Sequence, residues 1–143
     1  MDKYDALKLD NQLCFPLYAA SREIIKRYRP FLDALDLTYT QYIAMMVFWE
    51  EKRISVKNLG KKLFLDSGTL TPVLKSLEQK GFVRRYRSTE DERVLIVELT
   101  AEGEALKDRA LTIPEDVARN IKLTPEDTGT LYSLLYKILN EME

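Results

Sequence analysis

Histidine is absent from this chain of 143 residues, and cysteine occurs only once, at Cys14. An intrachain disulfide is therefore impossible. Zinc sites that need several cysteine or histidine ligands within one chain are excluded, and so are catalytic arrangements that rely on a histidine base. The sequence accordingly predicts no metal site and no cofactor. The chain either uses the sulfur atom of Cys14 alone or carries out no covalent chemistry.

Long apolar runs are also missing. No segment approaches the roughly 20 apolar residues that a membrane-spanning helix requires, and the N-terminus lacks the basic and apolar stretches of a secretory signal. With 45% apolar and 31% charged residues, the composition is typical of a globular domain that buries a core. An unpaired cysteine fits a reducing compartment. We therefore expect one domain, located in the cytoplasm and without membrane contact.

Neither sign of charge dominates the chain, whose formal net charge is −1. The charges are nevertheless segregated. Residues 52–93 contain 11 basic and 5 acidic side chains, whereas residues 1–51 contain 6 and 8, and residues 94–143 contain 5 and 10. Because exposed charges act over only about 10 Å at moderate salt, a basic middle segment is compatible with local nucleic-acid binding. A solvated lysine-rich surface explains the same charges equally well.

Apolar residues recur at spacings of three and four over most of the chain, which predicts a mainly helical fold. A long helix is expected over residues 10–35, with Pro16 either opening it or kinking its first turns. Pro114 is expected to interrupt or bend a later helix. Each of the predicted helices after the first begins next to a side chain that can cap its first turn. These capping candidates are Thr40, Ser55, Asp66 or Ser67, Thr100 and Thr124.

Two short helices with a tight connection are expected between residues 55 and 81, a pattern typical of a helix-turn-helix. The hydrophobic period then changes from that of a helix to that of a strand. Residues 82–87 and 94–99 are predicted to form a two-stranded hairpin with residues 88–92 at its tip. The middle of the chain is thus expected to be a helix-turn-helix followed by a β-hairpin.

The second short helix is expected to bury four apolar residues, Leu70, Val73, Leu74 and Leu77. Its open surface is small, polar and rich in hydroxyl groups. Small side chains allow a helix backbone to approach base edges, and serine and threonine can bond to bases or phosphates. An ordinary exposed helix would have a similar surface. The residues predicted to contact DNA from this surface are Ser67, Gly68, Thr69, Thr71, Pro72, Lys75 and Gln79.

The hairpin adds basic side chains to this surface. Arg84, Arg85 and Arg87 are predicted to contact DNA from one strand, and Arg93 follows the acidic tip. An arginine at a wing tip can enter the minor groove, where a narrow cleft concentrates negative potential. Asp91 is expected to hold Arg93 through a charge-assisted hydrogen bond. An Asp-x-Arg turn is a weak signal alone, but helix-turn-helix, basic strand and arginine-tipped turn in this order indicate DNA binding.

These motifs resemble the MarR family of winged-helix repressors, and the resemblance spans essentially the whole chain. It is carried by residues 66–75, 77–81 and 91–93 and by Leu99-Thr100. The resemblance implies a mainly α fold with a small β-hairpin wing, in a homodimer whose terminal helices are intertwined. Such a dimer would place two winged domains on the half-sites of a pseudo-palindromic operator in double-stranded DNA.

The resemblance also implies how the chain is divided. Residues 1–143 would form a single MarR-type domain. Within it, residues 1–36 and 101–143 would make the helical dimerisation region, and residues 37–100 the winged helix-turn-helix that binds DNA. A dimer would provide a partner for the apolar faces of the terminal helices.

Within that family, the segments around Cys14 and Tyr39 resemble the organic-hydroperoxide sensors of the OhrR type. The resemblance implies that Cys14 is the redox-sensing residue and that Tyr28 and Tyr39 hydrogen-bond its sulfur. Tyr18 lies four residues after the cysteine and shares its face in a regular helix. A peroxide sensor needs a thiolate, and a helix N-terminus and phenolic O–H donors both favour that charged form. Single-cysteine regulators of virulence and general oxidation carry a very similar segment.

The resulting hypothesis is a repressor that leaves its operator when an organic hydroperoxide oxidises Cys14. The sulfur would first become a sulfenic acid. Because the chain has no second cysteine, either a mixed disulfide with a low-molecular-weight thiol or overoxidation should follow. No peroxidase active-site motif is present, so we do not expect an enzyme. The alternatives are a regulator that binds a small phenolic ligand, with Cys14 as filler, and a winged helix that binds protein.

Overall fold

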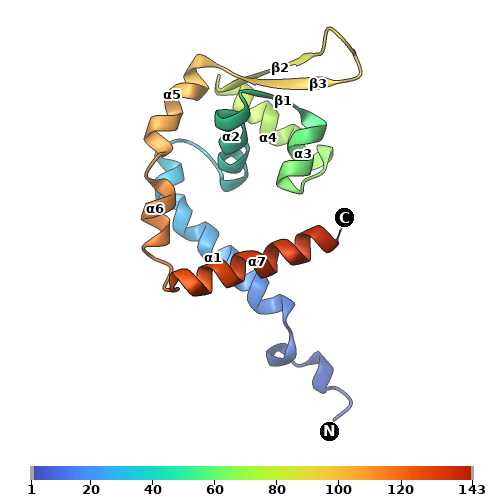
Figure 1. Cartoon of the computed structure of the whole chain (residues 1–143), viewed down its shortest axis with the longest axis vertical. Coiled ribbons are helices and arrows are strands. Elements are labelled where there is room, and N and C mark those ends of the chain that lie inside the picture. The colour runs from blue at the N-terminus through green and yellow to red at the C-terminus, as the bar shows by residue number, and fades with distance from the viewer. Residues whose placement is uncertain (1, 143) are drawn as a thin grey trace. The chain divides into compact units, whose positions relative to one another are not determined.

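The computed structural model describes residues 2–142 and divides into two compact units, Met1–Ile113 and Pro114–Glu143, each of which is described by itself. Most of the chain is helical, with one small sheet (Figure 1). The 3-10 helices are η1 (Asp5–Leu7) and η2 (Leu9–Asn11). The α-helices are α1 (Cys14–Asp33), α2 (Tyr39–Glu51), α3 (Val56–Leu63), α4 (Ser67–Gln79), α5 (Ala101–Ala110), α6 (Ile113–Ala118) and α7 (Pro125–Glu141), and the strands are β1 (Arg53–Ser55), β2 (Val83–Arg87) and β3 (Leu95–Leu99).

Most helices begin at the capping residues that the sequence predicted. The side chains of Ser55, Asp66, Thr100 and Thr124 each accept a hydrogen bond from a backbone N–H in the first turn of α3, α4, α5 and α7, respectively. Such bonds satisfy donors that have no partner inside a helix. At the other end of α4, Gly81 adopts a positive φ of 84°, a conformation that favours glycine and ends the helix.

The predicted cap of α2 was wrong by two residues. Thr38, and not Thr40, is the N-cap, because its Oγ1 accepts a hydrogen bond from the backbone N–H of Gln41. The Gln41 side chain accepts one in return from the backbone N–H of Thr38, at 3.0 Å. This reciprocal capping box needs a residue such as glutamine three positions after the cap, and the residue three positions after Thr40 is Ile43.

Helix α1 begins at Cys14, so Pro16 is its third residue. The first turn of a helix has no intrahelical acceptors for its N–H groups, and a proline there sacrifices no hydrogen bond. The sequence left open whether Pro16 opens the helix or kinks its first turns. In the structure, Pro16 lies in the opening turn of α1. Within the first unit, the N-terminal half of α1 extends away from the sheet (Figure 1).

The sheet contains the predicted hairpin and one additional strand. Its order is β1-β3-β2 and both pairs are antiparallel, with Arg84 and Arg53 each opposite Glu98 on β3. Strand β1 was not predicted, because a strand of three residues is too short to show an alternating pattern. The sheet lies against α2, α3 and α4, and the hairpin extends beyond them (Figure 1). This arrangement is a winged helix-turn-helix.

The core of the first unit lies between the sheet and helices α2, α3 and α4. Trp49 on α2 donates a hydrogen bond from Nε1 to the carbonyl oxygen of Gly103, at 2.9 Å, and so fixes α5 against α2. A Cβ atom at Gly103 would lie only 2.2 Å from the carbonyl oxygen of Phe82, so this close approach requires glycine. The largest fully buried side chains in this core are Met45, Phe48, Leu59, Leu70, Leu74, Leu77, Val83 and Val97.

No helix within residues 2–142 is both long and apolar enough to cross a membrane. In the same part of the chain, no group of three or more histidine, cysteine or acidic side chains is placed to hold a metal ion.

Candidate nucleic-acid interface and redox site

The open surface of α4 has the composition and exposure that the sequence predicted. Leu70, Leu74 and Leu77 are buried, whereas Val73 is only half-buried. The residues that face away from the core are all exposed, namely Ser67, Gly68, Thr69, Thr71, Pro72, Lys75 and Gln79. Only serine, glycine, threonine and proline occupy the first two turns of this surface, so the backbone of α4 can approach another molecule closely.

Local hydrogen bonds fix the start of α4. The Asp66 carboxylate accepts a bond of 2.7 Å from the backbone N–H of Thr69, and this bond holds the pKa of Asp66 below its ordinary value. The hydroxyl group of Thr71 donates to the carbonyl oxygen of Ser67 at 2.8 Å. The carboxylate is thus charged at neutral pH, and α4 begins at a defined residue with its polar surface outward.

The tip of the wing is held by an ion pair between Asp91 and Arg93. The two carboxylate oxygens accept hydrogen bonds from Nε and Nη2 of the arginine, at 3.0 and 3.1 Å, and one of them also accepts from its backbone N–H. These bonds hold the pKa of Asp91 below its ordinary value. The Arg93 side chain is nevertheless 91% exposed. The pair therefore presents a positive group at the end of the hairpin in a restrained orientation.

The three arginines of β2 differ in what they contact. Arg85 forms an ion pair with Glu78 of α4, at 3.2 Å, and its side chain is only 22% exposed. Arg84 pairs with Glu98 of β3, at 2.7 Å, and remains 67% exposed. Arg87 is exposed. Arg85 thus links the wing to α4, and its side chain is less exposed than expected for a residue predicted to contact DNA. The side chains of Arg84 and Arg87 remain accessible.

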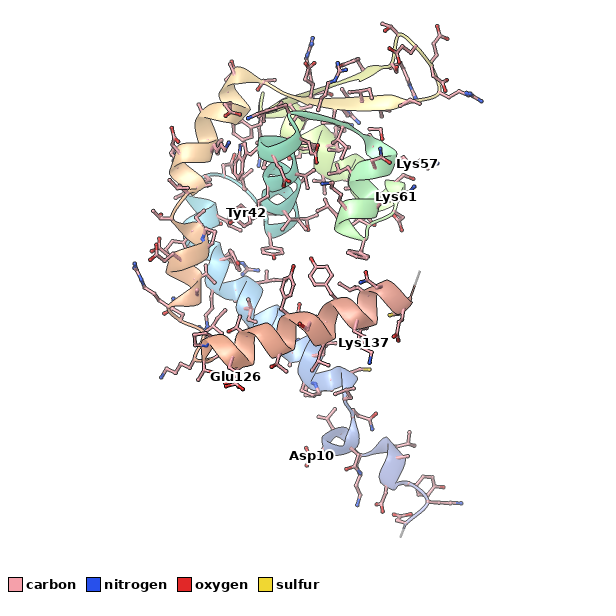
Figure 2. All side chains as sticks on the ribbon, in the orientation of Figure 1. Asp10, Tyr42, Lys57, Lys61, Glu126 and Lys137 are labelled. Carbon is pink, nitrogen blue, oxygen red and sulfur yellow. The ribbon has the colours of Figure 1, made fainter. Side chains whose placement is uncertain are left out.

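A further group of cations was not among the predicted DNA contacts. Lys57 and Lys61 are exposed on α3, and Figure 2 shows both on the side of that helix away from α2. Lys61 also lines a surface cavity of about 590 Å³ together with Arg53 and Lys62. Lys62 is engaged by Glu51, at 2.9 Å. This cationic face could have been predicted from the sequence, because the spacing of four residues between Lys57 and Lys61 places both on one helical face.

Cys14 is exposed and is the first residue of α1. Helix N-termini carry a partial positive charge that favours nearby anions. Tyr18 lies one turn later on the same face and is 60% exposed. Its ring lies 5.0 Å from the guanidinium carbon of Arg22, which also donates a long hydrogen bond of 3.4 Å to the hydroxyl group. Cysteine, tyrosine and arginine therefore follow one another along a single face of α1.

Tyr28 and Tyr39 belong to a separate cluster where α1 packs against α2. Their ring centroids lie 5.0 Å apart, and Tyr42 lies 5.8 and 6.2 Å from Tyr28 and Tyr39, respectively (Tyr42 is labelled in Figure 2). Burial raises the pKa of all three phenols, that of Tyr42 to about 12. At neutral pH these hydroxyl groups are therefore protonated and can donate hydrogen bonds.

A single chain does not bring Cys14 to this tyrosine cluster. Cys14 and Tyr28 lie on the same helix, 14 residues apart, which corresponds to about 21 Å at 1.5 Å per residue. The hydrogen bonds predicted from Tyr28 and Tyr39 to the sulfur therefore cannot form within one protomer. Of the four predicted redox residues, Cys14 and Tyr18 lie one turn apart on α1, and Tyr28 and Tyr39 contact each other at a separate place.

Comparison with known proteins gives a family match to the middle of the chain and a similar protein that aligns with nearly all of it. Residues 24–110 match the family described as Transcriptional regulator SarA/Rot. The chain is 48% identical to the organic hydroperoxide resistance transcriptional regulator of Bacillus subtilis, over 99% of this chain and 96% of that protein.

Solved structures with the same fold include complexes with DNA. Overoxidised AbfR of Staphylococcus epidermidis bound to DNA is 34% identical, with a TM-score of 0.79 over 99% of this chain and 100% of the other. AbfR has also been solved in a reduced form bound to DNA and in a disulfide form. A mutant of MarR from Escherichia coli in complex with operator DNA is 26% identical, with a TM-score of 0.82 over 97% and 99% of the two chains.

Proposed function

Since this chain belongs to the MarR and SarA family of winged-helix transcriptional regulators, we propose that it is a redox-sensing repressor of the OhrR type. In this proposal the reduced protein binds an operator in the cytoplasm, and oxidation of Cys14 by an organic hydroperoxide releases it. The observation that carries DNA binding is the exposed hydroxyl-rich surface of α4, next to a wing whose Arg93 is oriented by Asp91. The complexes of AbfR and MarR with DNA support it.

In the proposed complex, α4 enters the major groove and the wing tip reaches the adjacent minor groove. The α4 residues from Ser67 to Pro72 approach the bases, because small side chains allow the helix to come close. Arg93 follows the narrow minor groove, where negative potential is concentrated. The exposed lysines of α3 contribute phosphate contacts, which add affinity but carry no sequence information.

The protein acts as a homodimer in this proposal, because its terminal helices expose apolar side chains that one chain does not cover. Leu13 is 80% and Leu134 is 54% exposed, and the structure buries no residue of α7. Residues 1–36 and 101–143 form the dimerisation region, and residues 37–100 bind one half-site. Two protomers would then place their α4 helices on the half-sites of a pseudo-palindromic operator, about one helical turn apart.

The dimer also accounts for the separation between Cys14 and the tyrosine cluster. If the two α1 helices cross in opposite directions, the N-terminus of one helix lies near the tyrosine cluster of the second protomer. The protonated phenols of Tyr28 and Tyr39 would then donate hydrogen bonds to the sulfur across the interface, which stabilises the thiolate. The redox site is therefore complete only in the dimer.

The proposed reaction consumes one hydroperoxide per cysteine. The thiolate attacks the terminal oxygen of the hydroperoxide, an S–O bond forms, the O–O bond breaks, and the alkoxide leaves as an alcohol after protonation. A low-molecular-weight thiol then attacks the sulfenic sulfur, so that a disulfide forms and water leaves. We propose this mixed disulfide as the releasing form, because overoxidised AbfR is found on DNA.

The test compares operator binding of the wild type and of Cys14→Ser. Each protein is titrated onto a fluorescent duplex from upstream of its own gene, before and after treatment with equimolar cumene hydroperoxide and free cysteine. Wild-type affinity should fall by about a hundredfold or more, within the range of strong allosteric coupling. The serine variant should keep its affinity, because its oxygen cannot be oxidised. Mass spectrometry should find one cysteine adduct per wild-type chain.

Two results would contradict the proposal in different ways. If reduced protein had no affinity for this duplex at moderate salt, the repressor role would be lost. If Cys14→Ser left the DNA as readily as the wild type, Cys14 would not be the sensor. Hydrogen peroxide in place of cumene hydroperoxide tests the oxidant, and equal sensitivity to both would favour a regulator of general oxidation.

A further inference from the structure

Gln41 is the only polar side chain among the buried residues of the described chain, with 6% of its surface exposed. A buried amide is costly unless its donors and acceptor find partners. The Gln41 oxygen accepts from the backbone N–H of Thr38, at 3.0 Å, and from the ammonium group of Lys80, at 3.1 Å. Its nitrogen donates to the hydroxyl oxygen of Ser76, also at 3.0 Å.

These partners determine which way the amide points. The backbone N–H of Thr38 and the ammonium group of Lys80 can only donate, so the amide oxygen has to face them. The amide nitrogen then faces the hydroxyl group of Ser76, which accepts. A hydrophobic residue of the same size would leave all three partners without this contact. The arrangement is therefore a specific polar link and does more than fill space.

The link joins two parts of the molecule with different proposed roles. Thr38 and Gln41 flank Tyr39, whose ring packs against Tyr28 in the tyrosine cluster. Ser76 and Lys80 belong to the C-terminal end of α4, whose N-terminal half carries the exposed DNA-contacting surface. Lys80 also donates to the carbonyl oxygen of Asp36 in the loop before α2. The start of α2 and the end of α4 are thus tied by three side chains.

We infer that Gln41 is a positioning residue that couples the tyrosine cluster to the orientation of α4. This inference rests on the proposed redox function and names the contact that transmits it. When Tyr28 and Tyr39 change their partners on oxidation, the start of α2 moves, and the Gln41 amide moves Ser76 and Lys80 with it. Helix α4, which is proposed to enter the major groove, then leaves the position in which it fits its half-site.

The experiment measures one ratio, the dissociation constant of oxidised protein divided by that of reduced protein, for the duplex and reagents described above. Gln41→Leu removes the amide and keeps the side-chain size, and Ser76→Ala removes its partner on α4. Each substitution should reduce the ratio about tenfold, because buried hydrogen bonds are worth about one decade in an equilibrium. The double variant should fall no further, since both substitutions break the same link.

Glu78→Gln is the matched control. It weakens a different polar contact of α4, the ion pair with Arg85 at 3.2 Å, on the side of the wing. This variant should bind DNA less tightly in both redox states and leave the ratio unchanged. A purely structural role of Gln41 would behave in the same way, with a lower melting temperature and equal losses of affinity in both states.

The outcomes distinguish the inference from the function on which it rests. A wild-type ratio near one would overturn both. A high wild-type ratio that persists in Gln41→Leu and Ser76→Ala would overturn the coupling role and leave the redox function standing. Should Gln41→Leu fail to fold, Ser76→Ala alone decides the question, because Ser76 is only partly buried and its substitution leaves the core intact.

Discussion

At the scale of single residues, the wing tip depends on one restrained arginine. Arg93 is highly exposed, yet three hydrogen bonds to the Asp91 carboxylate limit its orientations. A side chain that is already ordered loses less entropy when it binds. In the proposed complex, the carboxylate thus contributes to DNA binding without touching DNA, although its own charge repels phosphates.

Arg93→Ala should weaken operator binding about tenfold, as expected for loss of one groove contact. Asp91→Ala should weaken it by a smaller factor, because the arginine remains but is no longer restrained. The double variant should resemble Arg93→Ala, since the carboxylate acts through the arginine. Fluorescence anisotropy at fixed salt measures all three.

Glu92→Ala is the control at the same tip, because it removes a neighbouring carboxylate that makes no hydrogen bond to Arg93 in the described structure. It should leave affinity unchanged or raise it slightly by reducing repulsion. Unchanged affinity in Arg93→Ala would exclude the wing tip from the interface.

At the scale of elements, α4 is held from two sides. The Gln41 amide joins its C-terminal end to α2, and Glu78 joins it to the wing by accepting hydrogen bonds from the backbone N–H and the guanidinium group of Arg85. These bonds hold the pKa of Glu78 below its ordinary value of 4.5. The contacts of Ser76 and Glu78, which are both partly buried, therefore fix the orientation of α4 and of its exposed surface.

The lowered pKa of Glu78 predicts how its contribution depends on pH. A carboxyl group whose pKa is lower in the folded state stabilises the fold fully above its unfolded pKa, and this contribution is lost as the pH falls through the folded pKa. Glu78→Gln should therefore be about 1 kcal/mol less stable than the wild type at pH 7. The difference should shrink below about pH 4.5. Urea unfolding followed by Trp49 fluorescence measures it, and a difference independent of pH would show that the charge is not involved.

At the scale of the whole molecule, the terminal helices have too few partners in one chain. Large apolar side chains remain exposed on the first turns of α1 and along α7, whereas the winged region buries a dense core. Contiguous exposed apolar surface in a protein of this size usually marks an interface. The proposed dimer buries these side chains and also completes the redox site.

Leu134→Glu should convert the dimer to a monomer in sedimentation experiments, because it places a charge within the apolar face of α7. Operator affinity should fall by a hundredfold or more, on the order of losing one of two linked half-sites. Lys137→Glu is the matched control, since the two residues lie on the same helix but Lys137 lies outside its apolar face (labelled in Figure 2). A monomer that still bound the full operator tightly would contradict the dimeric mechanism.

Local chemistry explains which features the sequence predicted. Four capping residues, the polar surface of α4 and the Asp91–Arg93 pair each involve residues within a few positions of one another. The family was also evident from such short motifs. The cap of α2 was missed although it too is local, because the return bond from Gln41 decided between two threonines.

The sequence by itself determined the starts of α3, α4, α5 and α7, the exposed hydroxyl-rich surface of α4, the charge of the wing and the presence of a single cysteine. Only the tertiary structure decided that Arg85 pairs with Glu78, that Gln41 is buried where α2 meets α4, and that Tyr28 of α1 packs against Tyr39 of α2. Contacts between residues distant in sequence depend on how elements pack, and a periodic pattern identifies a face without identifying what covers it. For Cys14, which is exposed in one chain, we propose that a second copy of the chain is the covering partner.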